Sequence, residues 1–178
     1  MSNDIRILTL SDVPAYQSLV AATAADLQAS GNPEFLYFHT PEVRDRALAE
    51  GRIVGHFVDN LLIGAVTFEE GDISDILQQR FPDVADVPQG LGDGIYTSNG
   101  MVIPKTRCKG VLTGIMQHIV DMHPTQQVTG TMHYENVVPQ RVHAAIGSFP
   151  VAILHSATRP TMVLCARPAY AERKSALA

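Results

Sequence analysis

The stretch VIPKTRCKGVLTGIMQHIV, residues 102–120, combines residue types that suit the binding of a small anion. A β-branched run reaches a proline, and a short basic loop then leads to Gly110 and an apolar-periodic segment. The basic residues are Lys105, Arg107 and Lys109. A strand that leads into a helix N-terminus presents unpaired backbone N–H groups and a helix dipole to negative charge. The pattern predicts either an anion-binding loop or a simple solvated connection.

The charge composition of the chain makes this loop stand out. The formal net charge is -5, and two of only three lysines lie in the loop. An acidic chain without a basic stripe is not expected to bind nucleic acid. A local positive cluster in such a chain suits a small anionic ligand.

Chain-wide features narrow the class of protein. The 178 residues predict one domain with a full core. No apolar run approaches the roughly 20 residues of a membrane span, and the N-terminus lacks the apolar region of a signal peptide. We therefore expect a cytosolic protein without membrane contact. Cys108 and Cys165 give no zinc spacing and no histidines stand four residues apart, so no metal is expected.

The elements that must position the loop follow from turn signals and hydrophobic periodicity. The predicted strands are residues 5–10, 53–58, 62–68, 95–103, 126–134, 151–157 and 161–166. The predicted helices, with their caps, are residues 11–31, 40–51, 72–81, 110–123 and 136–147, and Ser11 is the expected cap of the first. Hairpins together with a βαβ crossover predict an α/β (α+β) fold. Its sheet is mixed and mostly antiparallel, with about seven strands and helices on both faces.

We expect a single domain over residues 1–178, with an insertion at residues 72–94 and a frayed tail at residues 169–178. The insertion includes a long irregular stretch. Such a stretch inside a compact domain is either a functional lid or a decorative loop, and the sequence leaves both interpretations open.

These features resemble the GNAT superfamily of N-acetyltransferases over nearly the whole chain. The family's pyrophosphate signature, Q/R-x-x-G-x-G/A, stands between its fourth strand and third helix, and residues 107–112, RCKGVL, occupy that place. Arg107 and Gly110 match the signature, whereas Leu112 stands where the family has a small residue. The side chain of Leu112 either points into the core or reshapes the binding of coenzyme A.

A second motif supports the resemblance. Residues 135–149, ENVVPQRVHAAIGSF, are similar to the family's late helix pattern N-x-x-x-x-R-h-Y-x-x-h-G-F. Asn136 and Arg141 fall in register, and in the family this asparagine contacts the pantetheine arm. His143 stands where a family tyrosine often protonates the leaving thiolate. The alternatives are a helix cap for Asn136 and a half-buried helix histidine for His143.

The resemblance implies that acyl-coenzyme A lies in a V-shaped opening between the strands at residues 100–103 and 126–134. A backbone N–H near residues 100–102 would polarise the thioester carbonyl, and an amine would attack it directly. A glycine in the middle of the first strand fits a bulge there. The implied cofactor-binding residues are Gly100, Met101, Val102, Ile103, Arg107, Cys108, Lys109, Gly110, Val111, Leu112, Asn136 and Arg141.

The general base is less evident from the sequence. Many family members carry a carboxylate early on the fourth strand, where this chain has Tyr96, and a phenol with a pKa of about 10 is a poor base at neutral pH. Glu69 ends the preceding strand and is either a second candidate or a solvated strand end. The candidate catalytic residues are therefore His143, Tyr96 and Glu69.

The resemblance implies an acyl-coenzyme A-dependent N-acyltransferase that moves an acetyl group from acetyl-coenzyme A to the amine of a small molecule. One alternative is a GNAT-fold module that binds coenzyme A or regulates without turnover. Another is an acyltransferase for a different thioester or acceptor, with the insertion at residues 72–94 shaping the pocket. Strand-mediated dimers are common in the family, so a homodimer is also an expectation.

Overall fold

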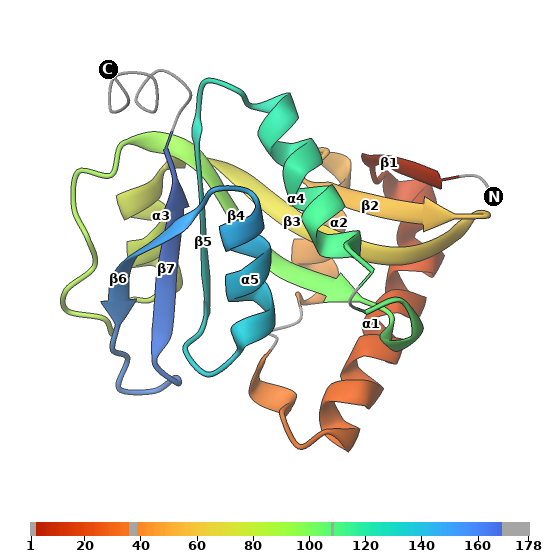
Figure 1. Cartoon of the computed structure of the whole chain (residues 1–178), viewed down its shortest axis with the longest axis horizontal. Helices are drawn as coiled ribbons and strands as arrows, with labels where there is room; N and C mark the ends of the chain where they lie inside the picture. The colour runs from red at the N-terminus through yellow and green to blue at the C-terminus, as the bar shows by residue number, and fades with distance from the viewer. Residues whose placement is uncertain (1–2, 36–38, 108, 169–178) are drawn as a thin grey trace. The chain divides into compact units, whose positions relative to one another are not determined.

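The structure of the chain is a computed structural model that describes residues 3–35, 39–107 and 109–168. Seven strands form a sheet in the order β1-β2-β3-β4-β5-β7-β6 (Figure 1). The pairing of β4 with β5 is parallel, and the β1–β2, β2–β3, β5–β7 and β6–β7 pairs are antiparallel. The mixed, mostly antiparallel sheet and the α/β (α+β) fold class predicted from the sequence are confirmed.

The order of the elements also agrees with the prediction, and the differences lie at the ends of elements. The strands are β1 (Asn3–Ile7), β2 (Ile53–Val58), β3 (Leu61–Asp72), β4 (Asp93–Val102), β5 (Gln127–His133), β6 (Phe149–Leu154) and β7 (Met162–Arg167). The helices are α1 (Val13–Ala29), α2 (Pro41–Ala49), α3 (Ile73–Arg80), α4 (Val111–Met122) and α5 (Val137–Ala145).

The chain divides into two compact units, which are described separately below. The first unit contains residues 1–68 and 98–119, and the second contains residues 69–97 and 120–178. The strands β3 and β4 and the helix α4 contribute residues to both units. The expectation of one domain over the whole chain stays a prediction, and the predicted tail lies outside the described residues.

In the first unit, helices cover both faces of the strands (Figure 1). Gly64 of β3 faces α4, because a methyl group on Gly64 would lie 2.6 Å from Val111 Cγ1 and 3.4 Å from Ile115 Cδ1. A buried cluster joins α1 and α2 to the opposite face of the strands. Its members are Leu8, Tyr16, Leu19, Ala47, Leu48, Ile53, Phe57, Leu62, Ala65 and Met101.

The hairpin that joins β2 to β3 turns at Asp59 and Asn60, as predicted. Both residues have positive φ, 48° and 65°. A two-residue turn with both residues left-handed matches the twist of the paired strands, and Asp and Asn tolerate this conformation because their side chains bond locally to the backbone. The local sequence is therefore sufficient to set the turn of this hairpin.

The start of α1 differs from the prediction. Ser11 was the expected cap, but α1 begins at Val13 and the residue before it is Asp12. The Asp12 carboxylate accepts the Thr9 backbone N–H at 2.9 Å and the Arg6 guanidinium at 2.7 Å. These bonds, with the Arg6 bond the larger cause, lower the pKa of Asp12 to about 2. The capping prediction was wrong because a 3-10 turn, Leu10–Asp12, precedes α1 and is capped by Thr9 in a capping box with Asp12, which leaves Ser11 inside the turn.

The second unit has its own core on the α3 side of its strands. Its buried cluster is Ile73, Leu77, Phe81, Val84, Val87, Tyr96, Leu154, Met162 and Leu164. Asp72 caps α3 through its side-chain oxygen, which accepts the N–H groups of Ser74 at 2.8 Å and Asp75 at 3.2 Å. Phe81, Val84 and Val87 belong to the segment predicted as an insertion. The segment therefore supplies core side chains to this unit.

A polar clasp also fixes this segment within the second unit. The Asp83 carboxylate accepts hydrogen bonds from the Ser156 hydroxyl at 2.5 Å and from the Thr158 N–H and hydroxyl at 3.1 and 2.9 Å. The Arg159 guanidinium lies 5.2 Å from the centre of the Phe81 ring. The turn between β6 and β7 is thus held to the segment by polar and aromatic contacts. This packing favours a structural role over a decorative loop.

The replacement Asp83→Asn should lower the melting temperature of the protein at neutral pH. Hydrogen bonds from Ser156 and Thr158 favour the charged carboxylate and lower the pKa of Asp83 from 3.8 to about 2. A lowered folded-state pKa contributes stability above the unfolded-state pKa, and this contribution is lost as the pH falls through the folded-state pKa. The melting temperatures of wild type and variant should therefore converge as the pH falls from about 4 to about 2.

The matched control for this measurement is Asp86→Asn, an exposed carboxylate three residues along the same segment. It should change the melting temperature little at either pH. A difference between Asp83→Asn and wild type that stayed constant into acid would contradict the role given to the clasp.

Candidate functional site

The backbone of β4 is distorted at Asn99, within the first unit. Asn99 has φ of 51°, in the left-handed region, although it lies in the middle of a strand. The sequence pointed to a bulge at Gly100, and the left-handed residue is its neighbour. Asn is among the residues that tolerate left-handed φ. The N-G dipeptide, which usually signals a turn, is the sequence signal that could have identified this kink.

Gly100 has a different role, because it makes room for Leu112 of α4. A methyl group on Gly100 would lie 3.5 and 3.8 Å from the two δ-carbons of Leu112, and 3.9 Å from Val66 Cγ2. The Leu112 side chain therefore packs on the strands beneath α4. Of the two orientations left open by the sequence, the inward one is observed.

The strand residues after Gly100 can offer a ligand only their backbone. Met101 and Val102 are buried, and Met101 belongs to the core cluster of the first unit. The Ile103 N–H donates to the carbonyl of Ile63 at 3.0 Å. The Ile103 amide is thus already used by a protein partner.

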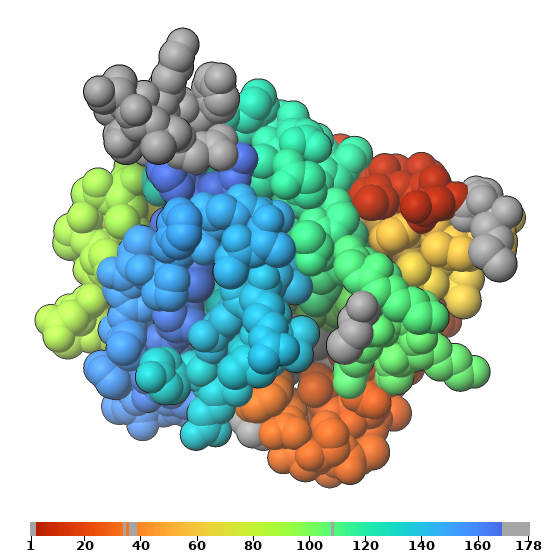
Figure 2. Space-filling view, in the orientation of Figure 1, coloured from red at the N-terminus to blue at the C-terminus, as the bar shows by residue number. Residues whose placement is uncertain are grey.

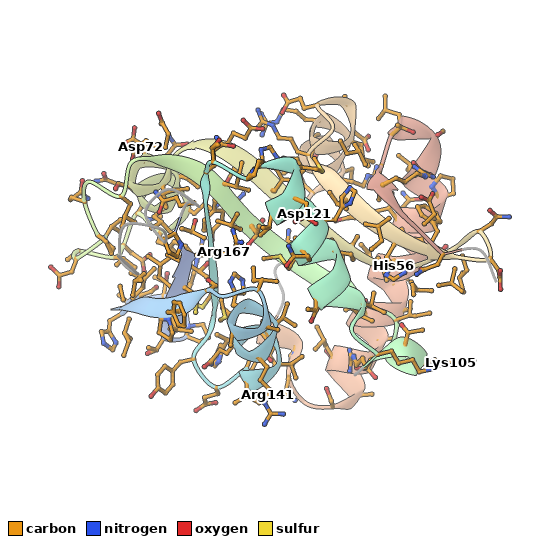
Figure 3. All side chains as sticks on the ribbon, turned by 45° about the horizontal axis from the view of Figure 1, so that its top comes forward. His56, Asp72, Lys105, Asp121, Arg141 and Arg167 are labelled. Atoms are coloured by element: carbon orange, nitrogen blue, oxygen red, sulfur yellow. The ribbon has the colours of Figure 1, made fainter. Side chains whose placement is uncertain are left out.

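The loop between β4 and α4 lies at the surface of the first unit (Figure 2). Pro104–Thr106 forms a single 3-10 turn, closed by the Arg107 N–H, which donates to the Pro104 carbonyl at 3.2 Å. Lys105 and Lys109 are exposed, and Figure 3 shows Lys105 pointing away from the ribbon. Cys108, a predicted site residue, lies outside the described residues.

Gly110 stands immediately before the first residue of α4. Its φ is 75°, and among the described residues no atom beyond its two chain neighbours lies within 4 Å of the position that a Cβ would take. Its carbonyl accepts the Gly114 N–H at 2.8 Å, so the helix is already regular here. Val111, the next residue, is buried against Gly64. The helix start is thus anchored from below and unobstructed at Gly110, the arrangement that an anion-binding N-terminus requires.

Arg107 has a protein partner that the sequence did not reveal. Its guanidinium forms an ion pair with the carboxylate of Asp26 in α1. The two residues are 81 positions apart in the chain, so only the tertiary structure brings them together. Because Arg107 is paired with Asp26, the exposed positive charge of the loop comes from Lys105 and Lys109.

A polar cluster surrounds the kink at Asn99. The side-chain amide nitrogen of Asn99 lies 2.7 Å from His39 Nε2, and the Thr67 hydroxyl lies 3.3 Å from the same nitrogen. Thr67 also hydrogen-bonds the phenol of Tyr16, whose pKa is raised by burial. The sequence did not identify these residues as a site, and His39 carries no local signal that could have done so.

In the second unit, two predicted catalytic residues lie together around Arg80. The Arg80 guanidinium is 2.6 Å from the Glu69 carboxylate and 5.0 Å from the centre of the Tyr96 ring. The Tyr96 hydroxyl bonds to Thr131 Oγ1 at 2.5 Å. Tyr96 is fully enclosed, and burial raises its pKa further above the ordinary value of 10.0. Each group is engaged by a protein partner, and the ionised, basic form of Tyr96 is less populated here than in water.

His143, the third predicted catalytic residue, is buried and packs on Gly130 of β5. A methyl group on Gly130 would lie 2.8 to 2.9 Å from two ring atoms of His143 and 2.7 Å from Thr97 Oγ1. His143 Nδ1 lies 3.2 Å from Ser148 Oγ. Burial lowers the pKa of His143 from 6.5 to about 4, so the ring is neutral at neutral pH. This environment opposes the predicted role as a general acid, which stays a prediction.

Within the second unit the strands separate these groups. The register pairs Tyr96 with Thr129 and Thr97 with Gly130. Because side chains alternate along a strand, Tyr96 lies on one face of the β4–β5 pair and the Gly130 contact of His143 lies on the other. Tyr96 and Glu69 are therefore brought together through Arg80, and His143 is kept apart from them.

The remaining predicted residues of the second unit lie on α5. Asn136 is the half-buried residue before the helix, and its N–H donates to the His133 carbonyl at 2.9 Å. Its side chain makes no capping bond, so the alternative interpretation of Asn136 as a side-chain helix cap is not observed. Arg141 is exposed and points away from the ribbon in Figure 3.

Among residues 3–35, 39–107 and 109–168, no three His, Cys, Asp or Glu side chains are grouped so that they could hold a metal ion. In the same part of the chain, no helix combines the length and the apolar character needed to cross a membrane.

Comparisons with known proteins identify the fold. No protein-family model and no curated protein matches the sequence. Among solved structures, a GNAT-family acetyltransferase from Streptococcus agalactiae matches with a TM-score of 0.74 and 11% identity, over 93% of this chain and 95% of that chain. The ribosomal-protein-S18-alanine N-acetyltransferase from Escherichia coli has a TM-score of 0.64 and 14% identity, with 94% of each chain covered. The chain has the GNAT fold.

A third GNAT-fold match was solved with a ligand. Naa50 from Arabidopsis thaliana, in complex with the bisubstrate analogue CoA-Ac-MVNAL, has a TM-score of 0.64 and 11% identity, over 94% of this chain and 99% of that chain. The structural overlap establishes the fold that was predicted from two motifs and the order of elements. At identities this low, it establishes nothing beyond the fold. The chemistry of the site must be argued from the residues of this chain.

Replacing Leu112 by alanine should lower the stability of the protein. The side chain packs on Gly100 and Val66, so its removal from this partly buried position should cost about 1–2 kcal/mol of unfolding free energy. Leu61→Ala, at an exposed residue of β3, is the control and should cost little. Chemical denaturation measures both. A Leu112→Ala variant as stable as wild type would contradict the observed packing.

The stability of the protein should depend on pH through His143. Its folded-state pKa of about 4 lies below the ordinary 6.5, so the unfolded chain binds the proton first. Stability is then complete above pH about 6.5 and falls between pH 6.5 and 4, by up to the order of 3 kcal/mol. Denaturation of His143→Gln should lack most of this slope, whereas His155→Gln, at an exposed histidine, should retain it. Equal slopes in the two variants would contradict the assignment.

Proposed function

We propose that the chain is an acyl-coenzyme A-dependent N-acyltransferase that transfers an acetyl group from acetyl-coenzyme A to the amine of a small molecule. The observation that supports this most is the start of α4. Gly110 is left-handed and unobstructed, the helix N-terminus is fixed from below, and Lys105 and Lys109 are exposed beside it. These features together suit the pyrophosphate of coenzyme A, which carries negative charge into the positive end of the helix dipole.

The GNAT fold adds a second line of support. The acetyltransferases of this fold from Streptococcus agalactiae and Escherichia coli, and Naa50 with its coenzyme A analogue, cover nearly the whole of this chain. We infer that this chain binds acetyl-coenzyme A along the strand end and loop at residues 100–112. Within this segment the proposed contacts are the backbone of Gly100, Met101 and Val102 and the loop from Arg107 to Leu112.

The proposed reaction is direct attack on the thioester. The lone pair of a neutral amine forms a C–N bond to the acetyl carbonyl carbon, and the C–S bond then breaks. The proton lost by the nitrogen ends on the leaving sulfur, which gives free coenzyme A thiol and the amide. A backbone N–H of residues 100–102 would stabilise the negative charge that develops on the carbonyl oxygen. Placing amine and thioester in contact supplies much of the rate acceleration.

The state of the three predicted catalytic residues favours a second candidate function, the binding of coenzyme A without turnover. Glu69 is paired with Arg80, Tyr96 is enclosed, and the pKa of His143 is lowered to about 4. None of the three is set up as a base or acid at neutral pH. A module that binds coenzyme A without turnover would have this character. Binding of acetyl-coenzyme A without release of thiol over a broad amine panel would favour it over the enzyme.

The replacement Gly110→Glu should remove the binding of acetyl-coenzyme A. A carboxylate at the helix start repels the pyrophosphate, and we expect the dissociation constant to rise about 30-fold or more, roughly 2 kcal/mol. The left-handed φ of 75° strains any side chain here, but the fold should survive, since no described atom beyond the two chain neighbours lies within 4 Å of the new Cβ. Isothermal titration measures the affinity, and thermal melting checks the fold.

The control variant for this experiment is Gly90→Glu in the second unit. Gly90 has a similar φ, 70°, and equally open surroundings, so the backbone strain and the added charge are matched. It should leave the affinity unchanged. If Gly110→Glu bound acetyl-coenzyme A as tightly as Gly90→Glu, the loop would not be the pyrophosphate site.

A further inference from the structure

We propose that Asn99 binds the acceptor amine, and that His39 is the positioning residue that orients its side chain. The proposal rests on the proposed function, because it assigns an acceptor contact to the same strand end. All of the residues concerned, including Gly100–Val102, belong to the first unit. The class of acceptor that this contact selects is a primary amine in its neutral form.

The backbone of Asn99 is the first observation. A left-handed residue other than glycine inside a strand is uncommon, and such residues are retained where the surrounding structure holds them in place, often at binding sites. The residue after Asn99 is Gly100, where the backbone segment proposed for the thioester begins. The kink therefore places a polar side chain directly before the proposed reacting centre.

The hydrogen bonds of Asn99 are the second observation. Its amide nitrogen donates to His39 Nε2 at 2.7 Å, so this imidazole nitrogen is the acceptor of the bond. The other half of the amide, Oδ1, has no hydrogen-bond donor among the described residues. Asn99 is half-buried. The bond to His39 thus orients the amide and leaves a carbonyl oxygen with two lone pairs for a ligand.

The neighbouring residue adds unused hydrogen-bonding capacity at the same place. Ser98 Oγ is buried and has no hydrogen-bond partner within the described part of the chain. A buried polar atom without a partner is energetically unfavourable, so it calls for an explanation. Ser98 Oγ would be satisfied by a polar ligand that supplies a donor, whereas Asn99 Oδ1 is not among the fully buried unpaired atoms and stays accessible to a ligand.

The chemistry of an amide oxygen suits a nucleophilic amine. The oxygen accepts one N–H and so orients the nitrogen, whose lone pair remains available for attack. Because the amide is uncharged, it does not favour the ammonium form as a carboxylate would, and the reactive neutral amine is retained. A primary amine has a second N–H to lose during transfer and keeps the first bonded to Oδ1. A secondary amine must give up its only N–H, so it should be the poorer acceptor.

The decisive variant is Asn99→Gly, since glycine keeps the left-handed backbone without strain and removes only the side chain. We expect the affinity for acetyl-coenzyme A by isothermal titration to stay within about twofold of wild type. In a thiol-release assay with benzylamine, kcat/KM should fall about 30-fold or more, mostly through KM. Wild type should also prefer benzylamine to N-methylbenzylamine, and Asn99→Gly should lose that preference.

The positioning role of His39 is tested by two replacements. His39→Gln retains an acceptor for the Asn99 amide, whereas His39→Leu does not. We expect His39→Gln to keep most of the wild-type KM for benzylamine and His39→Leu to resemble Asn99→Gly. Equal effects of the two would show that the contact does not orient the amide.

The outcomes separate this inference from the proposed function. If wild type neither binds acetyl-coenzyme A nor releases thiol, the proposed function fails. The side-chain amide NMR signal of Asn99, identified by its absence from Asn99→Gly, then decides the inference. A shift of this signal on titration of wild type with benzylamine supports the amine contact without turnover. No shift at millimolar benzylamine, or equal kcat/KM in wild type and Asn99→Gly, overturns it.

Discussion

The first turn of α4 rests on two glycines of the strands beneath it, Gly64 and Gly100. A side chain at Gly64 would overlap Val111, at 2.6 Å, and the room over Gly100 is filled by Leu112. Dense packing does not leave such a contact free to slide, so it fixes where the helix begins. The position of Gly110, at the exposed start of the helix, is therefore fixed by the same packing. An apolar contact below the helix therefore determines the geometry of the exposed helix start and basic loop above it.

The polar groups near the middle of β4 are satisfied very differently in the two units. In the second unit, Glu69 has Arg80, and Tyr96 has Thr131 and the Arg80 cation. In the first unit, Asn99 Oδ1 and Ser98 Oγ have no partner among the described residues. Buried polar groups are normally paired because desolvation without a partner is unfavourable. The unpaired polar groups of β4 thus lie after residue 97, although the sequence suggested Tyr96 and Glu69 as site residues.

Much of the fold could be predicted because local chemistry sets the ends of elements. Thr40 and Pro41 begin α2, Asp59 and Asn60 make the hairpin turn, and Gly110 is left-handed at the start of α4. These are preferences of single residues or short patterns, so they can be read from the sequence without the tertiary structure. The prediction of Ser11 as a cap was wrong because the helical path begins earlier, at a 3-10 turn that Thr9 caps together with Asp12.

The sequence by itself determined the order of strands and helices, the placement of the loop at residues 103–110 at a helix start, and the resemblance that suggested coenzyme A. Only the tertiary structure decided which polar groups are engaged. It paired Arg107 with Asp26, enclosed His143 against Gly130 and joined His39 to Asn99 across 60 positions of the chain. The reason is physical: the charge and hydrogen-bonding state of a side chain depend on burial and on its partners. Both arise from packing between segments that are distant in the sequence.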